Sequence, residues 1–408
     1  MRFGILITIV GTALLPVSGH GAEGEGGSPR MQITVENWDK GGMLSRWAYT
    51  HVSEVFPTAV IRRGGAILEL PEQPRSDIAE LRLTGDKGSQ SFEEFIHNGA
   101  VDGCIIVHQG HIVYERYPAI RPNDLHITMS VTKAVVAATL AILEERGRID
   151  LEKPVDAFMP ELKRSGWGGV RLRDIVDMRS GIEGSENSGD PYRDPAHKQY
   201  QLEATLGLQP RTADKLPGPA REGNLIEFLG LLKRENKPGE RWAYTSSNTA
   251  IIGEIISRVT GRSLADSISE LIWSHIGADH DALMIQNERG FPVAHCGMAA
   301  TLRDVARFGL LFTKKYESRS AQPAIISDKI LKRMVSVRGG ADEKGSLPLT
   351  YQWDLLNDKG EMAKGGWAGQ LLYINRDKDL VIGYSGTNLT ADPKPEPLPC
   401  KVIAEKLF

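Results

Sequence analysis

The sequence lacks the features of a cross-linked or nucleic-acid-binding protein. Only three cysteines occur in 408 residues, so at most one disulfide can form and a disulfide framework is excluded. Lysine and arginine number 49 against 52 aspartate and glutamate, which is not the basic excess that binds a phosphate backbone. We therefore expect no nucleic-acid partner. Hydrophobic residues make up 41% of the chain, enough for stability to come from an apolar core.

Long apolar runs are also scarce, and the one that stands out lies at the N-terminus. Arg2 precedes an apolar stretch that Pro16 ends, and small residues follow from Ser18 to Ala22. The stretch is shorter than the roughly 20 residues that span a bilayer, so residues 1–22 are interpreted as a cleavable signal peptide rather than a membrane anchor. We expect a secreted or periplasmic protein with no stable membrane anchor, and a disordered leader over residues 23–35.

Strand-like patterns occur towards both ends of the chain. Two β-branched runs flank Gln109-Gly110 between residues 103 and 117, which predicts a hairpin. Near the C-terminus, residues 351–356, 367–375 and 380–385 have strand-like composition, and a short helix is expected over 399–408. Strands that are distant in sequence, with helices between them, predict one sheet built from both parts.

Helical patterns fill the middle of the chain. Apolar residues recur at helical spacing from Ser130 through Arg146, which predicts a long buried helix, and further helices are expected over 173–178, 225–233 and 249–259. We therefore predict an α/β (α+β) fold. The sheet domain would comprise residues 36–148 and 300–408, and a mainly helical domain would comprise residues 149–299.

The start of the long helix carries the first catalytic candidates. Ser130 and Lys133 are three residues apart, which on a helix places a hydroxyl and an amine on one face and within reach of each other. A buried lysine with a lowered pKa can act as the base that a serine nucleophile needs. The same spacing is also found at ordinary helix N-termini. Ser130 follows the turn-like Arg121-Pro122-Asn123-Asp124 and opens the helix, so its amide lies in the first turn and is free to donate to an oxyanion.

Two further segments are candidates for the same site. Tyr244 directly precedes an apolar helix and can point its phenol into a cleft, although an aromatic packed in the core is the plainer alternative. The run Lys364-Gly365-Gly366-Trp367 is a glycine-rich entry to a strand, where a substrate can approach the backbone and an edge amide can complete an oxyanion hole. A bulge or a simple turn is the alternative for this run.

Taken together, Ser-x-x-Lys at Ser130, the Tyr244 motif and the glycine-rich Lys364 segment resemble the serine β-lactamase-like and penicillin-binding-protein superfamily, in its class C-like branch. Within it, Tyr244-Thr245-Ser246-Ser247-Asn248-Thr249 and Ile276-Gly277-Ala278-Asp279-His280-Asp281-Ala282 are most similar to the 6-aminohexanoate-dimer hydrolase group. The resemblance implies a central antiparallel sheet flanked by helices, with an all-helical region inserted.

The resemblance also implies roles for single residues. Ser130 would be the nucleophile, Lys133 its base and Tyr244 a proton relay or an acid to the leaving group, with the backbone amides of Ser130 and Trp367 as the oxyanion hole. The remaining candidates would contact the substrate: Tyr192, which lies on a segment similar to the group's loop over the cleft, Ser246, Lys364 and Gly366. The resemblance implies a small-molecule amide or ester substrate, and no metal or organic cofactor. It leaves the oligomeric state open.

The sequence departs from the superfamily pattern at two positions. Ser246 stands where class C enzymes have asparagine, and Gly365 replaces the threonine of Lys-Thr-Gly, so β-lactam hydrolysis and binding of a substrate carboxylate are both disfavoured. A D-alanyl-D-alanine carboxypeptidase or weak class C-like β-lactamase is one alternative function, and a penicillin-recognising sensor without turnover is another. Ser385 lacks the final glycine of a nucleophile elbow, so we interpret it as structural.

Overall fold

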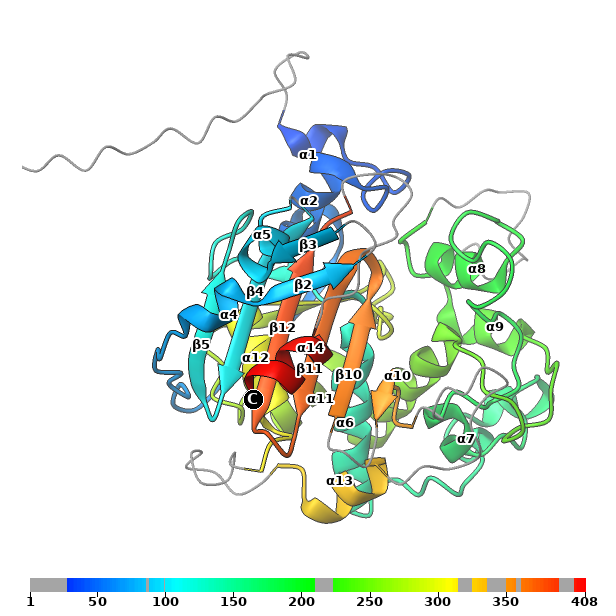
Figure 1. Cartoon of the computed structure of the whole chain (residues 1–408). Helices are drawn as coiled ribbons and strands as arrows, with labels where there is room; N and C mark the ends of the chain where they lie inside the picture. Colours follow the sequence, from blue (N-terminus) through cyan, green and yellow to red (C-terminus); the bar gives the residue numbers. More distant parts are fainter. Residues whose placement is uncertain are drawn as a thin grey trace, which may run out of the picture.

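A six-stranded antiparallel sheet forms the centre of the molecule (Figure 1). The computed structural model describes residues 28–85, 88–98, 100–209, 223–314, 325–335, 350–356, 361–388 and 400–408. The signal peptide expected over residues 1–22 lies outside these residues. In spatial order the sheet contains β5 (His111–Arg116), β4 (Val101–His108), β12 (Leu380–Gly386), β11 (Gln370–Asn375), β10 (Glu361–Gly366) and β9 (Leu355–Leu356). The predicted hairpin at Gln109-Gly110 is therefore present, as β4 and β5.

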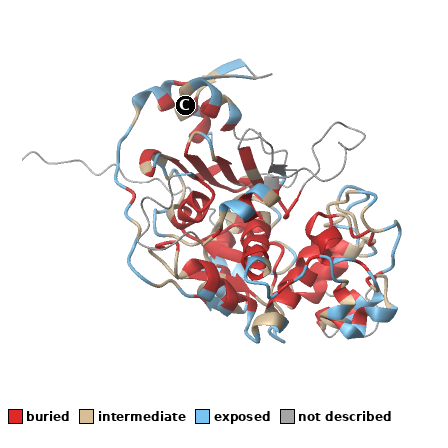
Figure 2. Ribbon diagram, turned by 90° about the horizontal axis from the view of Figure 1, so that it is seen from below, coloured by how far each residue is buried: buried red, intermediate tan, exposed pale blue. Residues whose placement is uncertain are grey.

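Helices cover both faces of this sheet because side chains alternate along each strand. On β4, Ile105 and Val107 belong to one apolar cluster, whereas Cys104 and Ile106 belong to another. The first cluster includes α6 (Thr132–Glu145) and α12 (Leu302–Leu310); the second includes α4 (Ser76–Glu80), α5 (Phe92–Ile96) and α14 (Cys400–Leu407). Buried residues accordingly concentrate in the sheet and in the helices packed against it (Figure 2).

Helix α6 is the predicted long buried helix. Every residue from Thr132 to Leu143 is buried, since the helix is apolar on nearly all sides and is surrounded by other elements. Helix α10 (Ser246–Thr260) packs against it, and α7 (Leu172–Val176), α8 (Lys198–Thr205) and α9 (Leu225–Leu231) lie beyond α10 (Figure 1). Helix α11 (Leu264–Ile268) and a π-helical turn at Ser269–Trp273 also pack against α6.

Two strands lie within residues 149–299, which the sequence predicted to be mainly helical. They are β7 (Ala282–Ile285) and β8 (Met298–Ala300), and they form a second antiparallel sheet with β1 (Thr58–Ile61) and β6 (His126–Ile127) in the order β1-β7-β8-β6. Both strands are short and almost wholly buried, so no alternation of polar and apolar residues marks them. This sheet brings residues 282–300 to the segment immediately before Ser130.

The N-terminal part of the described chain corrects one prediction. Residues 28–35 belong to the expected disordered leader, yet α1 (Pro29–Gln32) forms there and Ile33 is buried in the main core. The buried Ile33 side chain, together with a hydrogen bond from Arg30 Nε to the Glu54 carbonyl, holds this polar segment on the protein.

The remaining elements are α2 (Gly42–Thr50), α3 (Val52–Val55), α13 (Asp328–Val335), and the hairpin of β2 (Arg82–Gly85) and β3 (Gly88–Ser91). Within the described ranges, no helix combines the length and apolar character needed to cross a membrane.

A buried carboxylate joins the two sheets to the N-terminal helices. Asp102 on β4 is completely buried; its Oδ1 lies 2.7 Å from Nε of Arg46 on α2, and its Oδ2 lies 3.0 Å from Nε2 of His126 on β6. We expect Asp102→Ala to lower the free energy of unfolding by about 3–5 kcal/mol, because it removes the buried carboxylate that pairs with half-buried Arg46 and contacts buried His126. Urea denaturation measures the loss. The matched variant Glu240→Ala, which removes an exposed pair with Lys237, should cost under about 1 kcal/mol, and equal losses would contradict the prediction.

Candidate active site

Ser130 lies at the turn that leads into helix α6. It belongs to a short 3-10 helix, Met129–Val131, and Met129 before it has φ of 47°, a left-handed conformation that is strained for a residue other than glycine. The Ser130 side chain is partly exposed, in contrast to its buried neighbours. The amine of Lys133 in the first turn of α6 donates to Ser130 Oγ over 3.0 Å and to the carbonyl of His295 over 2.9 Å. The predicted serine–lysine pair is therefore in direct contact.

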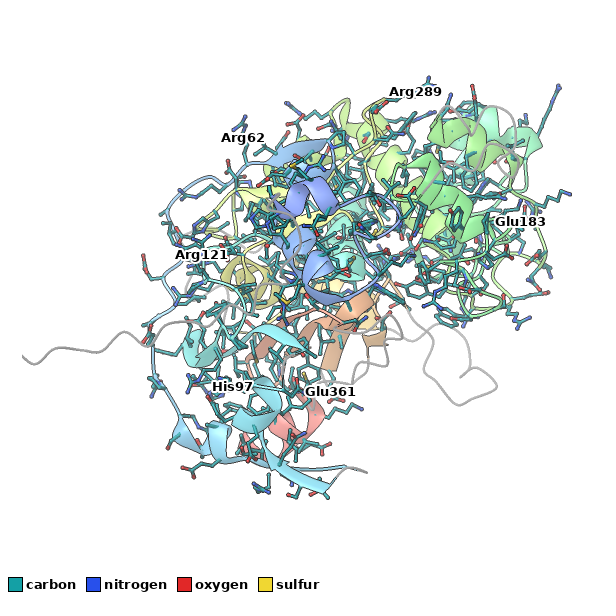
Figure 3. All side chains as sticks on the ribbon, turned by 90° about the horizontal axis from the view of Figure 1, so that it is seen from above. Arg62, His97, Arg121, Glu183, Arg289 and Glu361 are labelled. Atoms are coloured by element: carbon teal, nitrogen blue, oxygen red, sulfur yellow. The ribbon has the colours of Figure 1, made fainter. Side chains whose placement is uncertain are left out.

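Lys133 is in an unusual environment for a lysine. Its side chain is completely buried, whereas charged side chains such as Arg62, Arg121 and Arg289 lie exposed at the periphery of the molecule (Figure 3). Burial lowers the pKa of Lys133 from 10.5 to about 8, and the nearby ammonium of Lys364 acts in the same direction. A substantial fraction of this amine is therefore neutral near pH 8 and able to accept a proton.

Tyr244 is the third residue of the cluster that contains Ser130 and Lys133. It lies just before α10, and its phenol oxygen accepts a hydrogen bond of 3.0 Å from Nζ of Lys364, while Nζ of Lys133 lies 5.0 Å from the centre of its ring. Burial raises the pKa of Tyr244 well above its usual value, with Asp354 adding to the rise and a hydrogen bond with Ser130 opposing it. The phenol thus remains protonated, and Lys133 is the better base of the two.

Lys364 is not positioned as a direct substrate contact, the role expected from the sequence. Its side chain on β10 is completely buried, and its amine lies 4.5 Å from the centre of the Tyr244 ring. The amine also contacts Oδ1 of Asp354 at 2.5 Å, and Oδ2 of the same carboxylate accepts a 2.8 Å hydrogen bond from the amide of Gly365. Lys364 therefore lies behind Tyr244, in contact with its hydroxyl and its ring.

The glycine-rich end of β10 lies directly beside the nucleophile. A Cβ added to Gly366 would be 3.0 Å from the backbone nitrogen of Ser130 and 2.9 Å from Cβ of Met129, so only glycine fits there. This close approach places the backbone of Gly366, the residue immediately before Trp367, next to that of Ser130. An open cleft of about 480 Å³ begins at this point and is lined by residues that include Ser130, Tyr244, Asp354 and Trp367.

Tyr192 and Ser246 are joined at the cleft by a carboxylate. Glu186 accepts hydrogen bonds from the Tyr192 hydroxyl and, at 2.6 Å, from the Ser246 hydroxyl. The Tyr192 ring also packs on Trp367, with ring centres 5.2 Å apart. The segment that carries Tyr192 is therefore held against both sides of the cleft, and Ser246 orients Glu186.

A small inner pocket extends from Ser130 towards α8. It has a volume of about 30 Å³, and its lining includes Asp39, Gln199, Glu203 and His295. Glu203 accepts hydrogen bonds from Gln199 at 3.0 Å and from Gln209 at 3.1 Å, and burial raises its pKa to about 8. The inner pocket thus has both polar and apolar walls, since Trp38, Met129 and Leu208 also line it, and it admits only a small terminal group.

The structure brings the sequence candidates together and adds three acidic residues that sequence reasoning missed. Glu186 and Asp354 come from irregular segments with no repeating pattern, so nothing in the sequence singles them out. Glu203 had one usable signal, because Gln199 and Glu203 are four residues apart and share a face of α8.

Comparison with known proteins agrees with this arrangement. The family model described as Beta-lactamase matches residues 90–398. The 6-aminohexanoate-dimer hydrolase of Paenarthrobacter ureafaciens is 26% identical over 386 residues, which cover 91% of each chain. A solved structure from Bacillus anthracis, assigned to the 6-aminohexanoate-dimer hydrolases, is 27% identical, with a TM-score of 0.80 over 92% of this chain and 95% of that one.

A more distant structure shares the fold alone. A family VIII carboxylesterase is 18% identical and has a TM-score of 0.56 over 77% of this chain and 93% of its own. The match of the family model, which covers most of the chain, comes together with a serine, a buried lysine and a tyrosine in contact at one cleft. The chain therefore belongs to the β-lactamase family.

Proposed function

We propose that this serine hydrolase cleaves amide or ester bonds in small linear substrates through an acyl-enzyme on Ser130. The observation that carries the proposal is the 3.0 Å contact between Ser130 Oγ and the buried amine of Lys133, whose pKa is lowered to about 8. A serine hydroxyl becomes an effective nucleophile only when a neighbouring base removes its proton, and Lys133 meets that requirement.

In the acylation step, Ser130 Oγ forms a bond to the substrate carbonyl carbon as its proton moves to Lys133. The bond between that carbon and the leaving nitrogen or oxygen then breaks, and the leaving group takes a proton from Tyr244. The phenol is suited to this role because it remains protonated, and the hydrogen bond from Lys364 stabilises the negative charge that develops on its oxygen. Tyr244 regains a proton from Lys133, and water then releases the acid from Ser130 by the reverse sequence.

The tetrahedral intermediates need donors for the negative oxygen. We assign this role to the backbone amides of Ser130 and Trp367. The close approach of Gly366 to the Ser130 nitrogen supports the assignment, because it leaves the two amides on neighbouring backbone segments at the rim of the cleft. Removing one such donor typically costs about 10²–10³ in kcat, so this backbone geometry is a large part of the rate enhancement.

Linear substrates are favoured by the shape of the site and by the relatives. The open cleft and the narrow inner pocket meet at Ser130, so an extended chain can lie along the cleft with one small end group in the pocket. The relative from Paenarthrobacter ureafaciens is named for the dimer of 6-aminohexanoate. We propose that linear amides and short-chain esters are substrates of this protein.

A nitrophenyl butyrate assay tests the proposed function. We expect steady release of nitrophenol over many turnovers, together with a transient gain of one butyryl group that peptide mass spectrometry locates on Ser130. A single burst followed by lasting label would instead indicate a sensor that acylates without turnover. The absence of any label on Ser130 during turnover would exclude the acyl-enzyme.

A further inference from the structure

The charges of the cleft are arranged with the anions on its surface and the cations beneath. Lys133 and Lys364 are both completely buried. Asp354 and Glu186, in contrast, are among the described residues that line the cleft, and the Asp354 side chain is 37% exposed. A substrate therefore meets two carboxylates before it meets either ammonium group.

The charge of Lys364 is also already engaged. Its amine lies 2.5 Å from Oδ1 of Asp354 and donates to the Tyr244 hydroxyl over 3.0 Å. The second oxygen of Asp354 accepts from the Gly365 amide, which fixes the carboxylate at the mouth of the site. To bind Lys364, a substrate carboxylate would have to displace Asp354 from the lysine. It would also have to approach the negative charge of Asp354.

We propose that Asp354 is a specificity-determining residue that excludes substrates with a carboxylate next to the scissile bond. It does so by neutralising Lys364 and by placing its own charge on the wall of the cleft. The inference rests on the proposed acyl-enzyme function and narrows its substrate class to amides and esters without a carboxylate next to the scissile bond. Penicillins and peptides ending in D-alanine carry a carboxylate close to the reacting bond and are poor substrates on this reasoning.

The experiment compares the variant Asp354→Asn with the wild type on three nitrophenyl esters. One is neutral nitrophenyl butyrate, one is nitrophenyl hydrogen succinate with a carboxylate on the acyl side, and one is a carboxynitrophenyl butyrate with a carboxylate on the leaving group. Asparagine keeps the size and part of the hydrogen bonding but removes the charge. We expect the kcat/KM of at least one anionic ester, relative to the neutral ester, to rise about tenfold in the variant, as for one charge removed a few ångströms away.

Two control variants and a salt series separate this effect from a general change in activity. Glu145→Gln removes the same charge from an exposed residue at the far end of α6, ~20 Å from Ser130 at 1.5 Å per residue, and should leave the ratio unchanged. Asp354→Glu keeps the charge and should retain discrimination against the anionic esters. In the wild type, raising the salt from 0.01 to about 1 M shortens the screening length from about 30 to 3 Å, and it should narrow the gap between neutral and anionic esters.

The proposal would be overturned if the kcat/KM of both anionic esters, relative to the neutral ester, were unchanged in Asp354→Asn. If that variant does not fold, a wild-type ratio that is insensitive to salt would overturn the proposal instead. Either result leaves the acyl-enzyme intact, because the neutral ester is still hydrolysed through Ser130. Loss of wild-type turnover on the neutral ester would instead contradict the proposed function, and the specificity claim with it.

Discussion

Replacing Ser130 with alanine is expected to lower kcat for nitrophenyl butyrate by about 10⁵–10⁶-fold, the loss typical of removing a serine nucleophile. The hydroxyl is the group that Lys133 contacts at 3.0 Å, and alanine leaves no atom to form the acyl bond. Ser130 is partly exposed at the cleft, so the substitution creates no buried cavity and the fold should persist. Rate measurement checks the loss of kcat, and circular dichroism with the melting temperature checks that the fold persists.

Ser385 provides the matched control. It is a buried serine on β12, in the central sheet, and its sequence motif does not match that of a nucleophile. Ser385→Ala should keep kcat within a few-fold of the wild type, because no step of the mechanism uses its hydroxyl. If Ser385→Ala were inactive and Ser130→Ala active, both with native circular dichroism and an unchanged melting temperature, the nucleophile would be wrongly assigned.

The parts of the site that could be predicted from the sequence are those whose geometry is local. The contact between Ser130 and Lys133 follows from helical spacing alone, and the fold around them confirms the buried helix on which the prediction depended. Tyr244 was recognisable only through its motif, since nothing in its own neighbourhood indicates that its phenol meets Lys364, far away in the chain. Helical spacing predicts the Ser130–Lys133 pair, whereas Tyr244 is predicted only by the family resemblance.

Asp354 shows why the rest could not be predicted. It contacts Lys364 because β9 and β10 pair in one particular register, with Leu355 opposite Ala363 and the Asp354 amide donating to the Ala363 carbonyl. A shift of one residue would turn the carboxylate to the other face of the sheet. Two-residue β9 has too little pattern to reveal that register, so the neutralisation of Lys364, and with it the charge of the cleft, emerges only from the folded structure.

Replacing Lys133 with methionine is expected to lower kcat/KM by about 10²–10⁴-fold, the usual contribution of a positioned general base. Methionine fills the same buried space without a titratable group, so stability should be retained or improved. Lys133→Arg is the charge-conserving comparison. Arginine cannot give up its proton at any ordinary pH, so it should be as inactive as methionine if Lys133 is the base. Substantial activity in Lys133→Arg would show that the site needs only the positive charge.

The pH profile of the wild type gives an independent test of the same assignment. A base works in its neutral form, and with a pKa of about 8 only about a tenth of Lys133 is neutral at pH 7, against about nine-tenths at pH 9. The kcat/KM should therefore rise about tenfold per pH unit below pH 7, bend near pH 8 and level off above it, after subtraction of spontaneous ester hydrolysis. A lysine with its ordinary pKa would move the bend to about pH 10. A bend near pH 8 in the wild type, together with no such bend in the residual activity of Lys133→Met, would identify Lys133 as the titrating group. Tyr244 is still present in that variant, and its raised pKa cannot produce a bend at neutral to mildly alkaline pH.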